Sequence, residues 1–174
     1  MVRSRLPDEA TFELVNDADF AAFFAREFSS IALISGTTAG DRSSGEDIAQ
    51  EAFNRAHREW ERIGAFDKPG AWVRRVAINL ALTRRRSIGR EARAILRLGG
   101  GLRTTVDDHR HGDPQVWQAV KTLPPQQRAA IALHYFEDRP VIEIADLLGC
   151  SRSTATSHLH KARTRLAELL GGVQ

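Results

Sequence analysis

Hydroxyl, imidazole and cationic side chains are concentrated in one segment near the C-terminus, residues 151–165, which reads SRSTATSHLHKARTR. Short polar groups exchange hydrogen bonds with the edges of bases, and arginine and lysine contact phosphates. The chemistry that this segment supports is recognition of DNA, and we predict no catalytic residue in the chain. The predicted DNA-binding side chains of the segment are Arg152, Ser153, Thr154, Thr156, Ser157, His160, Lys161 and Arg163.

Two helices that meet at a sharp corner would position these side chains. Residues 141–148 have helical periodicity, and Gly149 supplies the left-handed backbone that a tight turn needs. Ser151 then caps a helix that begins at Arg152. Apolar residues of this second helix recur at spacings of four, three and four, which places them on one inward face. They are Ala155, Leu159, Ala162 and Leu166. The pattern predicts a helix-turn-helix whose second helix enters a DNA major groove.

A second basic helix is predicted over residues 72–86. Residues 68–103 contain 10 Lys and Arg against one Glu, whereas residues 1–67 contain 7 Lys and Arg against 13 Asp and Glu. The basic block suits a polyanion such as nucleic acid, although a merely solvated surface is the alternative. Its predicted DNA-binding side chains are Trp72, Arg75, Asn79, Thr83, Arg84 and Arg86. Trp72 either stacks on a base or belongs to the buried stripe of this helix, which also contains Val73, Val76, Ala77 and Leu80.

A third helix, predicted over residues 46–63, mixes amides and acids along one stripe. Ser44 lies three residues before Asp47, which is a capping-box signature. The polar stripe consists of Asp47, Gln50, Glu51, Asn54 and Arg58, and the apolar face consists of Ala49, Ala52, Phe53, Ala56, Trp60 and Ile63. The stripe is either a solvated face or a docking face for another protein.

These elements predict an all-α fold with two small helical domains joined by a flexible linker, the C-terminal one a helix-turn-helix. In the first domain, an earlier helix with Phe20, Phe24, Phe28 and Ile31 on one face is predicted to end before GTTAGDRSSG, residues 36–45. In the second, Pro124 and Pro125 separate two helices, and the predicted core is Trp117, Val120, Leu123, Ile131 and Tyr135. The domains span residues 1–86 and 114–174, with the linker over residues 87–113.

Composition sets further bounds on the protein. Its 174 residues are 42% hydrophobic and 27% charged, which fits one or two small soluble domains. The single cysteine, Cys150, permits neither an internal disulfide nor a cysteine-based zinc site. The N-terminus lacks the apolar segment of a secretory signal, and no apolar run of about 18 residues occurs. We therefore expect a cytoplasmic protein without membrane insertion.

Four ordered segments together resemble the bacterial extracytoplasmic-function (ECF) RNA polymerase sigma factors of the sigma-70 family. They are EDIAQEAF, KPGAWVRRVAINLALTRRRS, LPPQQRAAIALHYFED and IEIADLLGCSRSTATSHLHKARTRL, and the resemblance spans roughly residues 17–170. It implies an alternative sigma factor that binds core RNA polymerase and directs promoter recognition, DNA melting and transcription initiation, in the setting of a stress response. Residues 1–86 would be sigma region 2 and residues 114–174 sigma region 4.

The resemblance also implies a role for each predicted surface. Asp47, Gln50, Glu51, Phe53 and Asn54 would bind the β′ clamp helices of the polymerase. The helix from Trp72 to Arg86 would contact the minus-ten element, with Asn79 on a base and the loop 63–69 forming a pocket for an extruded base. The helix from Arg152 to Arg165 would read the minus-thirty-five element, and an apolar surface of the same domain would meet the β flap. An anti-sigma factor is the expected regulator, and no cofactor or metal is implied.

Some positions depart from the family pattern. Ala155 replaces a larger aliphatic residue, Thr156 occupies a site that is often basic, and His158 stands where arginine is frequent. His158 therefore predicts a weaker or pH-dependent phosphate contact.

Two alternatives come from other functional classes. His109, His111 and Asp113 lie close together in DDHRHGDP and could hold a metal for hydrolysis, although they lack a second shell to orient them. The second alternative is a stand-alone helix-turn-helix transcriptional regulator, with the first domain serving dimerisation or sensing. Such a regulator would protect DNA without polymerase.

Overall fold

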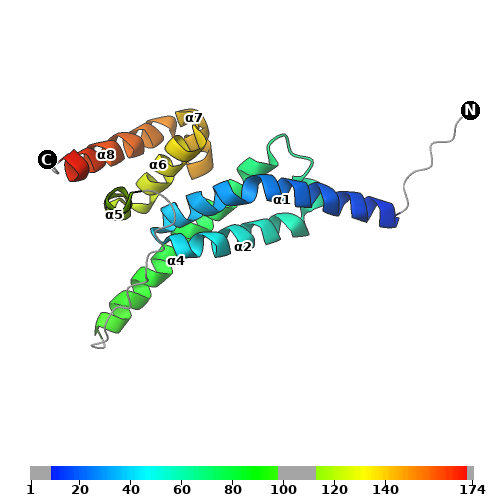
Figure 1. Cartoon of the computed structure of the whole chain (residues 1–174), viewed down its shortest axis with the longest axis horizontal. Helices are drawn as coiled ribbons and strands as arrows, with labels where there is room; N and C mark the ends of the chain where they lie inside the picture. The colour runs from blue at the N-terminus through cyan, green and yellow to red at the C-terminus, as the bar shows by residue number, and fades with distance from the viewer. Residues whose placement is uncertain (1–8, 98–112, 172–174) are drawn as a thin grey trace, which may run out of the picture.

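The computed structural model describes residues 9–97 and 113–171, with side chains for residues 17–84 and 113–171. Within these ranges the chain is helical and contains no strand, which confirms the all-α prediction (Figure 1). The elements are α1 (Glu9–Ala39), the 3-10 helix η1 (Arg42–Ser44), α2 (Gly45–Arg58), α3 (Trp60–Ile63), α4 (Pro69–Arg97), α5 (Pro114–Thr122), α6 (Pro125–Glu137), α7 (Val141–Leu148) and α8 (Arg152–Gly171).

The first lobe, α1 to α4, is built around an aromatic cluster. Phe53 of α2 contacts Phe20, Phe23 and Phe24 of α1, with ring centroids 6.3, 5.6 and 4.9 Å away. Trp60 lies 4.8 Å from Phe23 and closes the cluster at the end of α2. The residues predicted for the apolar face of the 46–63 helix are all buried. Amphipathic periodicity therefore identified the buried face of this helix correctly, whereas on α1 the predicted Phe20, Phe24 and Phe28 are half-buried and Phe23, which was not predicted, is buried.

The helix α1 extends four residues further than the sequence predicted, to Ala39. The GTT sequence at 36–38 lacks apolar side chains. These residues are nevertheless buried and helical, because the following segment at Asp41 and Arg42 packs directly on the helix. A Cβ at Gly36 would lie 3.1 Å from the Arg42 Cα, so glycine permits this close approach. The helix ends at Ala39, and the next residue, Gly40, has a left-handed φ of 73°.

The capping box predicted at Ser44 is absent. Ser44 occupies the N-cap position of α2, but its side chain makes no capping hydrogen bond and its hydroxyl instead donates to the Asp41 carbonyl at 2.9 Å. The Asp41 carboxylate accepts from the Ser43 amide at 3.2 Å and thereby caps η1. The single predicted helix over 46–63 is also interrupted at Glu59, which separates α2 from α3.

The second lobe, α5 to α8, contains the predicted helix-turn-helix. The helix α7 ends at Leu148, Gly149 has φ 64°, and α8 begins at Arg152. Ala155, Leu159 and Ala162 are buried, as their spacing predicted. Trp117, Val120, Leu123 and Ile131 also lie in the core. Tyr135 does not, since it is 55% exposed, and its assignment to the core was wrong.

The helix α4 continues to Arg97, into the segment predicted to be linker from residue 87. Residues 87–97 contain Ala, Leu, Arg and Glu, which are strong helix formers and favour continuation of the helix. Residues 98–112 of the predicted linker lie outside the described residues. The domain boundaries themselves stay a prediction.

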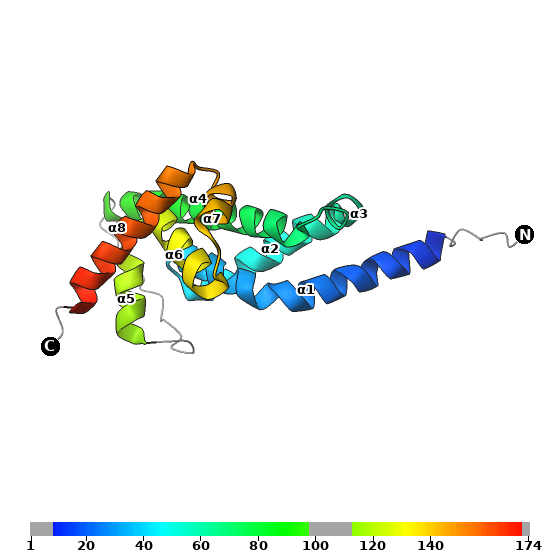
Figure 2. The ribbon, with the colours of Figure 1, turned by 90° about the horizontal axis from the view of Figure 1, so that it is seen from above.

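The two lobes pack against each other. Both views place α6 and α7 beside the first lobe, near the C-terminal half of α1 and the start of α4 (Figures 1 and 2). Ile34 of α1 and Ile78 of α4 belong to the buried cluster of the second lobe, and Ala71 and Leu82 pack against it. One face of α4 therefore packs within its own lobe, and a second face packs against the other lobe.

Candidate nucleic-acid interface

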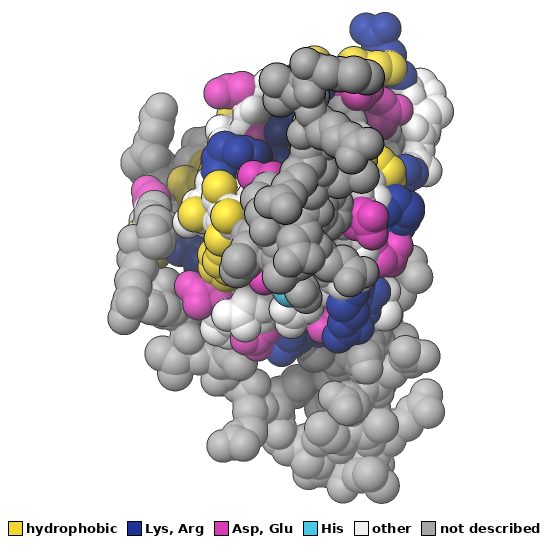
Figure 3. Space-filling model, turned by 90° about the vertical axis from the view of Figure 1, so that its right-hand side faces the viewer, with side chains coloured by type: hydrophobic (Ala, Val, Ile, Leu, Met, Phe, Trp, Pro, Cys, Tyr) yellow, Lys and Arg dark blue, Asp and Glu magenta, His cyan; other side chains and the backbone are white. Residues whose placement is uncertain are grey.

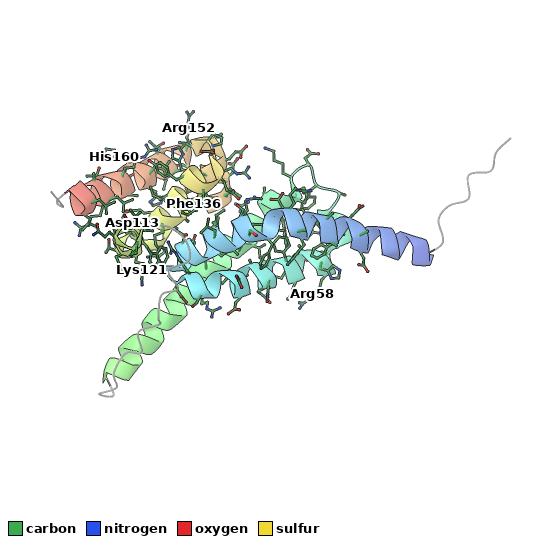
Figure 4. All side chains as sticks on the ribbon, viewed as in Figure 1. Arg58, Asp113, Lys121, Phe136, Arg152 and His160 are labelled. Carbon is green, nitrogen blue, oxygen red and sulfur yellow. The ribbon has the colours of Figure 1, made fainter. Side chains whose placement is uncertain are left out.

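The exposed face of α8 carries the side chains predicted to contact DNA. Arg152, Ser153, Thr154, Thr156, His160, Lys161 and Arg163 are exposed and Ser157 is half-buried. Arg152 and His160 lie on the side of α8 that faces away from the first lobe (Figure 4). The face therefore combines hydroxyl and imidazole groups with cations, which is the chemistry of groove recognition.

The start of α8 is fixed by a side-chain cap. The Ser151 Oγ accepts a hydrogen bond from the Thr154 amide at 3.1 Å, and it lies 2.8 Å from the Thr154 hydroxyl and 2.9 Å from the Ser153 hydroxyl. The Thr156 hydroxyl donates to the Arg152 carbonyl at 2.9 Å. Several of these hydroxyls thus have a partner within the helix, and they keep lone pairs that can accept a hydrogen bond from a base amino group.

Arg163 is held by a cluster that sequence reasoning missed. Its Nε donates to the Tyr135 hydroxyl at 3.0 Å, and its Nη2 lies 2.8 Å from the His134 Nε2. Because an arginine can only donate, His134 accepts at Nε2, and its Nδ1 then donates to the Arg139 carbonyl 3.3 Å away. Exposed Tyr135 therefore orients a predicted DNA-binding arginine instead of filling the core.

His158 is partly enclosed by the protein. Its side chain is half-buried, and its Nε2 is buried without a hydrogen-bond partner among the described residues. Burial, together with the nearby positive charge of Lys161, holds the pKa of His158 below its ordinary value. A half-buried imidazole with a lowered pKa contributes less positive charge to DNA binding, which agrees with a weaker phosphate contact, and the contact itself stays a prediction.

The predicted minus-ten face lies on α4. Arg75, Asn79, Thr83 and Arg84 are exposed, and the Thr83 hydroxyl donates to the Asn79 carbonyl at 2.9 Å. Trp72 is half-buried against the core of the first lobe. The side chain of Arg86 lies outside the described residues. On this face, the Asn79 amide lies between the cationic side chains of Arg75 and Arg84 in the sequence and is available to a ligand.

The loop between α3 and α4 exposes an aromatic ring next to this helix. Phe66 is 38% exposed, and the Arg62 guanidinium lies 5.5 Å from its ring centroid. A cation over an aromatic face provides a platform on which a planar base can stack. Sequence reasoning predicted a pocket in this loop but did not single out Phe66.

The polar stripe of α2 is largely available to a partner. Asp47, Gln50 and Asn54 are exposed, and Glu51 is half-buried and accepts a hydrogen bond from Arg55 at 2.8 Å. Phe53 is 1% exposed, so a direct surface contact was the wrong role for it in this conformation. Figure 3 shows acidic and basic side chains interspersed over one end of the molecule.

The predicted polymerase-binding and DNA-binding surfaces meet at an ion pair. The Arg84 Nη2 lies 3.8 Å from the Asp47 Oδ2. Both side chains are largely exposed, so this pair contributes little to stability. It brings the predicted polymerase-binding stripe of α2 and the predicted DNA-binding face of α4 side by side.

The alternative metal site receives no support from the described residues. No group of three His, Cys, Asp or Glu suitable for a metal occurs among them, and His109 and His111 lie outside them. Asp113 has a structural role, because its carboxylate accepts from the Gln115 amide at 2.8 Å and caps α5. Over the same described ranges, no helix has the length and apolar character needed to span a membrane.

Comparisons with known proteins match two separate parts of the chain. The family described as Sigma-70 region 2 matches residues 24–91, and the family described as Sigma-70, region 4 matches residues 114–166. An RNA polymerase sigma-E factor of Streptomyces antibioticus is 32% identical over 131 residues, which cover 75% of this chain and 72% of that protein. The ECF RNA polymerase sigma factor SigW of Bacillus subtilis is 27% identical over 145 residues, covering 75% and 78%.

A solved structure shares the fold. The sigma factor RpoE from Bartonella quintana, in complex with the anti-sigma factor NepR, matches with a TM-score of 0.71 and 22% identity. The match covers 90% of this chain and 99% of that chain. Similarity thus extends over both lobes.

Proposed function

Because the chain belongs to the ECF group of the sigma-70 family, we propose that it binds core RNA polymerase and directs promoter recognition, DNA melting and transcription initiation as an alternative sigma factor. The observation that carries this proposal is the presence of a region 2 lobe and a region 4 helix-turn-helix in one chain. A stand-alone regulator needs only the second.

The stripe on α2 is the proposed polymerase-binding surface. Asp47, Gln50 and Asn54 are exposed on consecutive turns, and Glu51 borders them. Carboxylates and amides on a rigid helix suit a basic or polar helical partner, such as the β′ clamp helices. Phe53 supports this surface from the core by fixing α2 against α1.

The face of α4 and the adjacent loop are the proposed minus-ten surface. Asn79 can form paired hydrogen bonds with a base edge, and Arg75 and Arg84 can neutralise phosphates. Phe66 can stack on a base that has left the duplex, and such stacking offsets the cost of unstacking, a few kcal/mol. During DNA opening, contacts of the base with the protein would then replace its stacking within the duplex.

The face of α8 is the proposed minus-thirty-five surface, and a groove behind it is the proposed site for the β flap. The groove has a volume of about 450 Å³ and lies between α5 and α8. Ala119, Leu169 and Leu170 make part of its lining. An apolar groove that is open to solvent suits an apolar helix of a partner.

We extend the proposal to the setting of the protein. Its polymerase and promoter are in the cytoplasm, which places the protein there as a transcription initiation factor without an enzymatic reaction of its own. An anti-sigma factor is the proposed regulator, in line with the relative that was solved in complex with one.

The proposal is tested by adding the purified protein to core polymerase in run-off transcription. We expect initiation to depend on the protein, and we expect Asp47→Ala combined with Gln50→Ala to weaken its association with the core enzyme. Glu61→Ala removes an exposed acid of the same lobe outside the stripe and is the matched control. Protection of DNA by a dimer without polymerase, with no initiation in its presence, would favour the stand-alone regulator.

A further inference from the structure

Two side chains of α6 hold one edge of the Arg163 guanidinium. The Nε of Arg163 donates to the Tyr135 hydroxyl at 3.0 Å, and its Nη2 lies 2.8 Å from the His134 Nε2, which accepts because an arginine can only donate. Both contacts involve the same edge of a planar group, so together they fix its orientation as well as its position. The Arg163 Cζ also lies 5.6 Å from the centroid of the Tyr135 ring.

The residues that hold Arg163 are themselves fixed. Because Nε2 of His134 is the acceptor, Nδ1 carries the proton and donates to the Arg139 carbonyl, in the segment after α6, at 3.3 Å. The His134 and Tyr135 rings meet edge to face, with centroids 4.9 Å apart and an interplanar angle of 85°. The acceptors for Arg163 are therefore in place before any ligand arrives.

The held edge leaves the far end of the guanidinium available to a ligand. A guanidinium has five N–H donors, and the contacts with Tyr135 and His134 use one on Nε and one on Nη2. The remaining donors of Nη1 and Nη2 include two parallel N–H bonds, which match two oxygens of a phosphate. Arg163 is exposed and forms no ion pair within residues 17–84 and 113–171, so its charge is not neutralised there.

The other cations of α8 are held differently from Arg163. Arg165 pairs with Glu168 of its own helix at 3.2 Å. Arg152 and Lys161 are exposed, and within the described ranges no hydrogen bond or ion pair holds either side chain. Immobilising a long side chain on binding lowers affinity by about two- to tenfold. For Arg163 this ordering has already occurred in the folded protein.

The position of Arg163 along α8 suits a phosphate more than a base. It follows His160 by one turn on the same side of the helix, and His160 is on the side that faces away from the first lobe (Figure 4). The first residues of a recognition helix contact base edges. Arg163 lies about 17 Å along the helix axis from Arg152, and the major groove is about 12 Å wide. A side chain this far from the helix start would meet the sugar-phosphate backbone at the edge of the groove.

We propose that Arg163 binds one backbone phosphate of the minus-thirty-five element through Nη1 and Nη2, and that Tyr135 and His134 are positioning residues for this contact. The inference rests on the proposed function and assigns a ligand group to one residue of the α8 surface. Tyr135 and His134 act through Arg163 and touch no DNA. Because a backbone phosphate carries no sequence information, the contact fixes the register of α8 on the duplex and leaves base recognition to the start of the helix.

Exchange of the Arg163 Nε–H with water tests the positioning without DNA or polymerase. In the nitrogen-15-labelled whole chain, the Nε–H signal of Arg163 is the one that Arg163→Lys removes. Tyr135→Phe deletes the acceptor and keeps the ring, and we expect it to speed exchange of this proton by about two- to tenfold. Thr164→Ala changes an exposed neighbour on α8 and is the matched control. Equal exchange rates in Tyr135→Phe and the parent protein would overturn the positioning role.

Salt dependence of promoter binding separates the contact from its positioning. Core polymerase with the parent protein or a variant is titrated onto promoter DNA at several salt concentrations. Arg163→Gln should weaken binding and make the slope of log affinity against log salt shallower by about 0.9, the value for one lost phosphate contact. Tyr135→Phe keeps the charge, so it should weaken binding by about two- to tenfold without changing the slope. Arg26→Gln removes an exposed arginine of α1 outside the proposed surfaces and should change neither quantity.

A double variant decides whether Tyr135 acts through Arg163. In an Arg163→Gln background, Tyr135→Phe should cause no further loss of affinity, because the side chain that it positions is absent. His134→Leu removes the other acceptor and should behave as Tyr135→Phe does. An equal loss with and without Arg163, or a shallower salt slope for either α6 variant, would refute the positioning role.

Neutral substitutions in the DNA backbone locate the phosphate. Methylphosphonate replaces one phosphate at a time in the minus-thirty-five duplex. We expect one position at which this change weakens binding of polymerase with the parent protein but not of polymerase with the Arg163→Gln variant. If no position shows this difference, Arg163 does not make the phosphate contact.

The outcomes separate this inference from the proposed function. If polymerase with the parent protein binds no promoter, the proposed function fails, and the exchange rate of the Arg163 Nε–H still decides whether Tyr135 positions this side chain. If promoter binding is intact and Tyr135→Phe binds as tightly as the parent protein, this inference is refuted and the proposed function stands.

Discussion

Replacement of Arg128 with methionine should destabilise the protein strongly, although the new side chain has a similar length and is apolar. The guanidinium is fully buried and makes four hydrogen bonds to the carbonyls of Thr38, Lys121 and Leu123. Arg128→Met leaves these three acceptors without the arginine, and a buried unsatisfied acceptor costs about 1–3 kcal/mol. Removal of a buried charge offsets part of this cost.

We therefore expect the free energy of unfolding to fall by about 3 kcal/mol or more, out of a total of about 5–15 kcal/mol for a typical domain. Urea denaturation followed by far-ultraviolet circular dichroism measures this difference. Arg152→Met, at an exposed arginine of the same lobe, should change the free energy by no more than about 0.5 kcal/mol. A loss below about 1 kcal/mol for Arg128→Met would refute the capping role assigned to this side chain.

Three further predictions concern the helix-turn-helix and the contact between the two lobes, in which the Arg74 Nε of α4 donates to Glu137 of α6 at 2.8 Å. Burial raises the pKa of Glu137, but hydrogen bonds, with that from Arg74 the largest, and the charge of Arg74 outweigh burial, so the pKa lies below its ordinary value. A carboxylate with a lowered pKa stabilises the contact fully at pH values above its ordinary pKa of about 4.3, and this stabilisation is lost as the pH falls through the lowered pKa. We therefore expect the lobes to separate in acid. Separation when the pH is raised from 7 to 9 would contradict this expectation. Gly149→Ala should cost about 1–2 kcal/mol because residue 149 has φ 64°, and an unchanged melting temperature would count against this strain. Ser151→Ala should cost about 1 kcal/mol through loss of the cap on the Thr154 amide, whereas Ser151→Asp should retain most of the stability in the same melting experiment.

Local signals explain what the sequence predicted well. Gly149 and Ser151 each satisfy a requirement of the backbone at one position, and the spacing of Ala155, Leu159 and Ala162 follows directly from helix geometry. The bounds of α7 and the start of α8 were therefore correct without knowledge of the rest of the fold. Similarly, the exposed stripe on α2 follows from periodicity within one helix.

Features that depend on distant parts of the chain could not be predicted in this way. Tyr135 is apolar enough for a core, but its position against Arg163, 28 residues later, makes it a surface residue. The Arg74–Glu137 pair joins positions 63 residues apart, and a charged residue carries no signal of a distant partner. Arg128 has no feature in the sequence that sets it apart from the other arginines, and its burial depends on carbonyls of both α1 and the end of α5.

Helix ends were predicted less well for the same reason. The polar sequence GTT of α1 is typical of a loop, and it is helical because the segment at Arg42 packs on it. The break between α2 and α3 at Glu59 has no glycine or proline that would have predicted it. Tertiary packing decided both positions, and it overrode the local preference.

The most direct test of the account is to map transcription start sites on genomic DNA with core polymerase, with and without the protein. We predict starts that appear only when the protein is present, preceded by two shared sequence elements about 10 and about 35 base pairs upstream, at a nearly fixed spacing. The same start sites with and without the protein would contradict the central claim that this chain selects promoters for RNA polymerase.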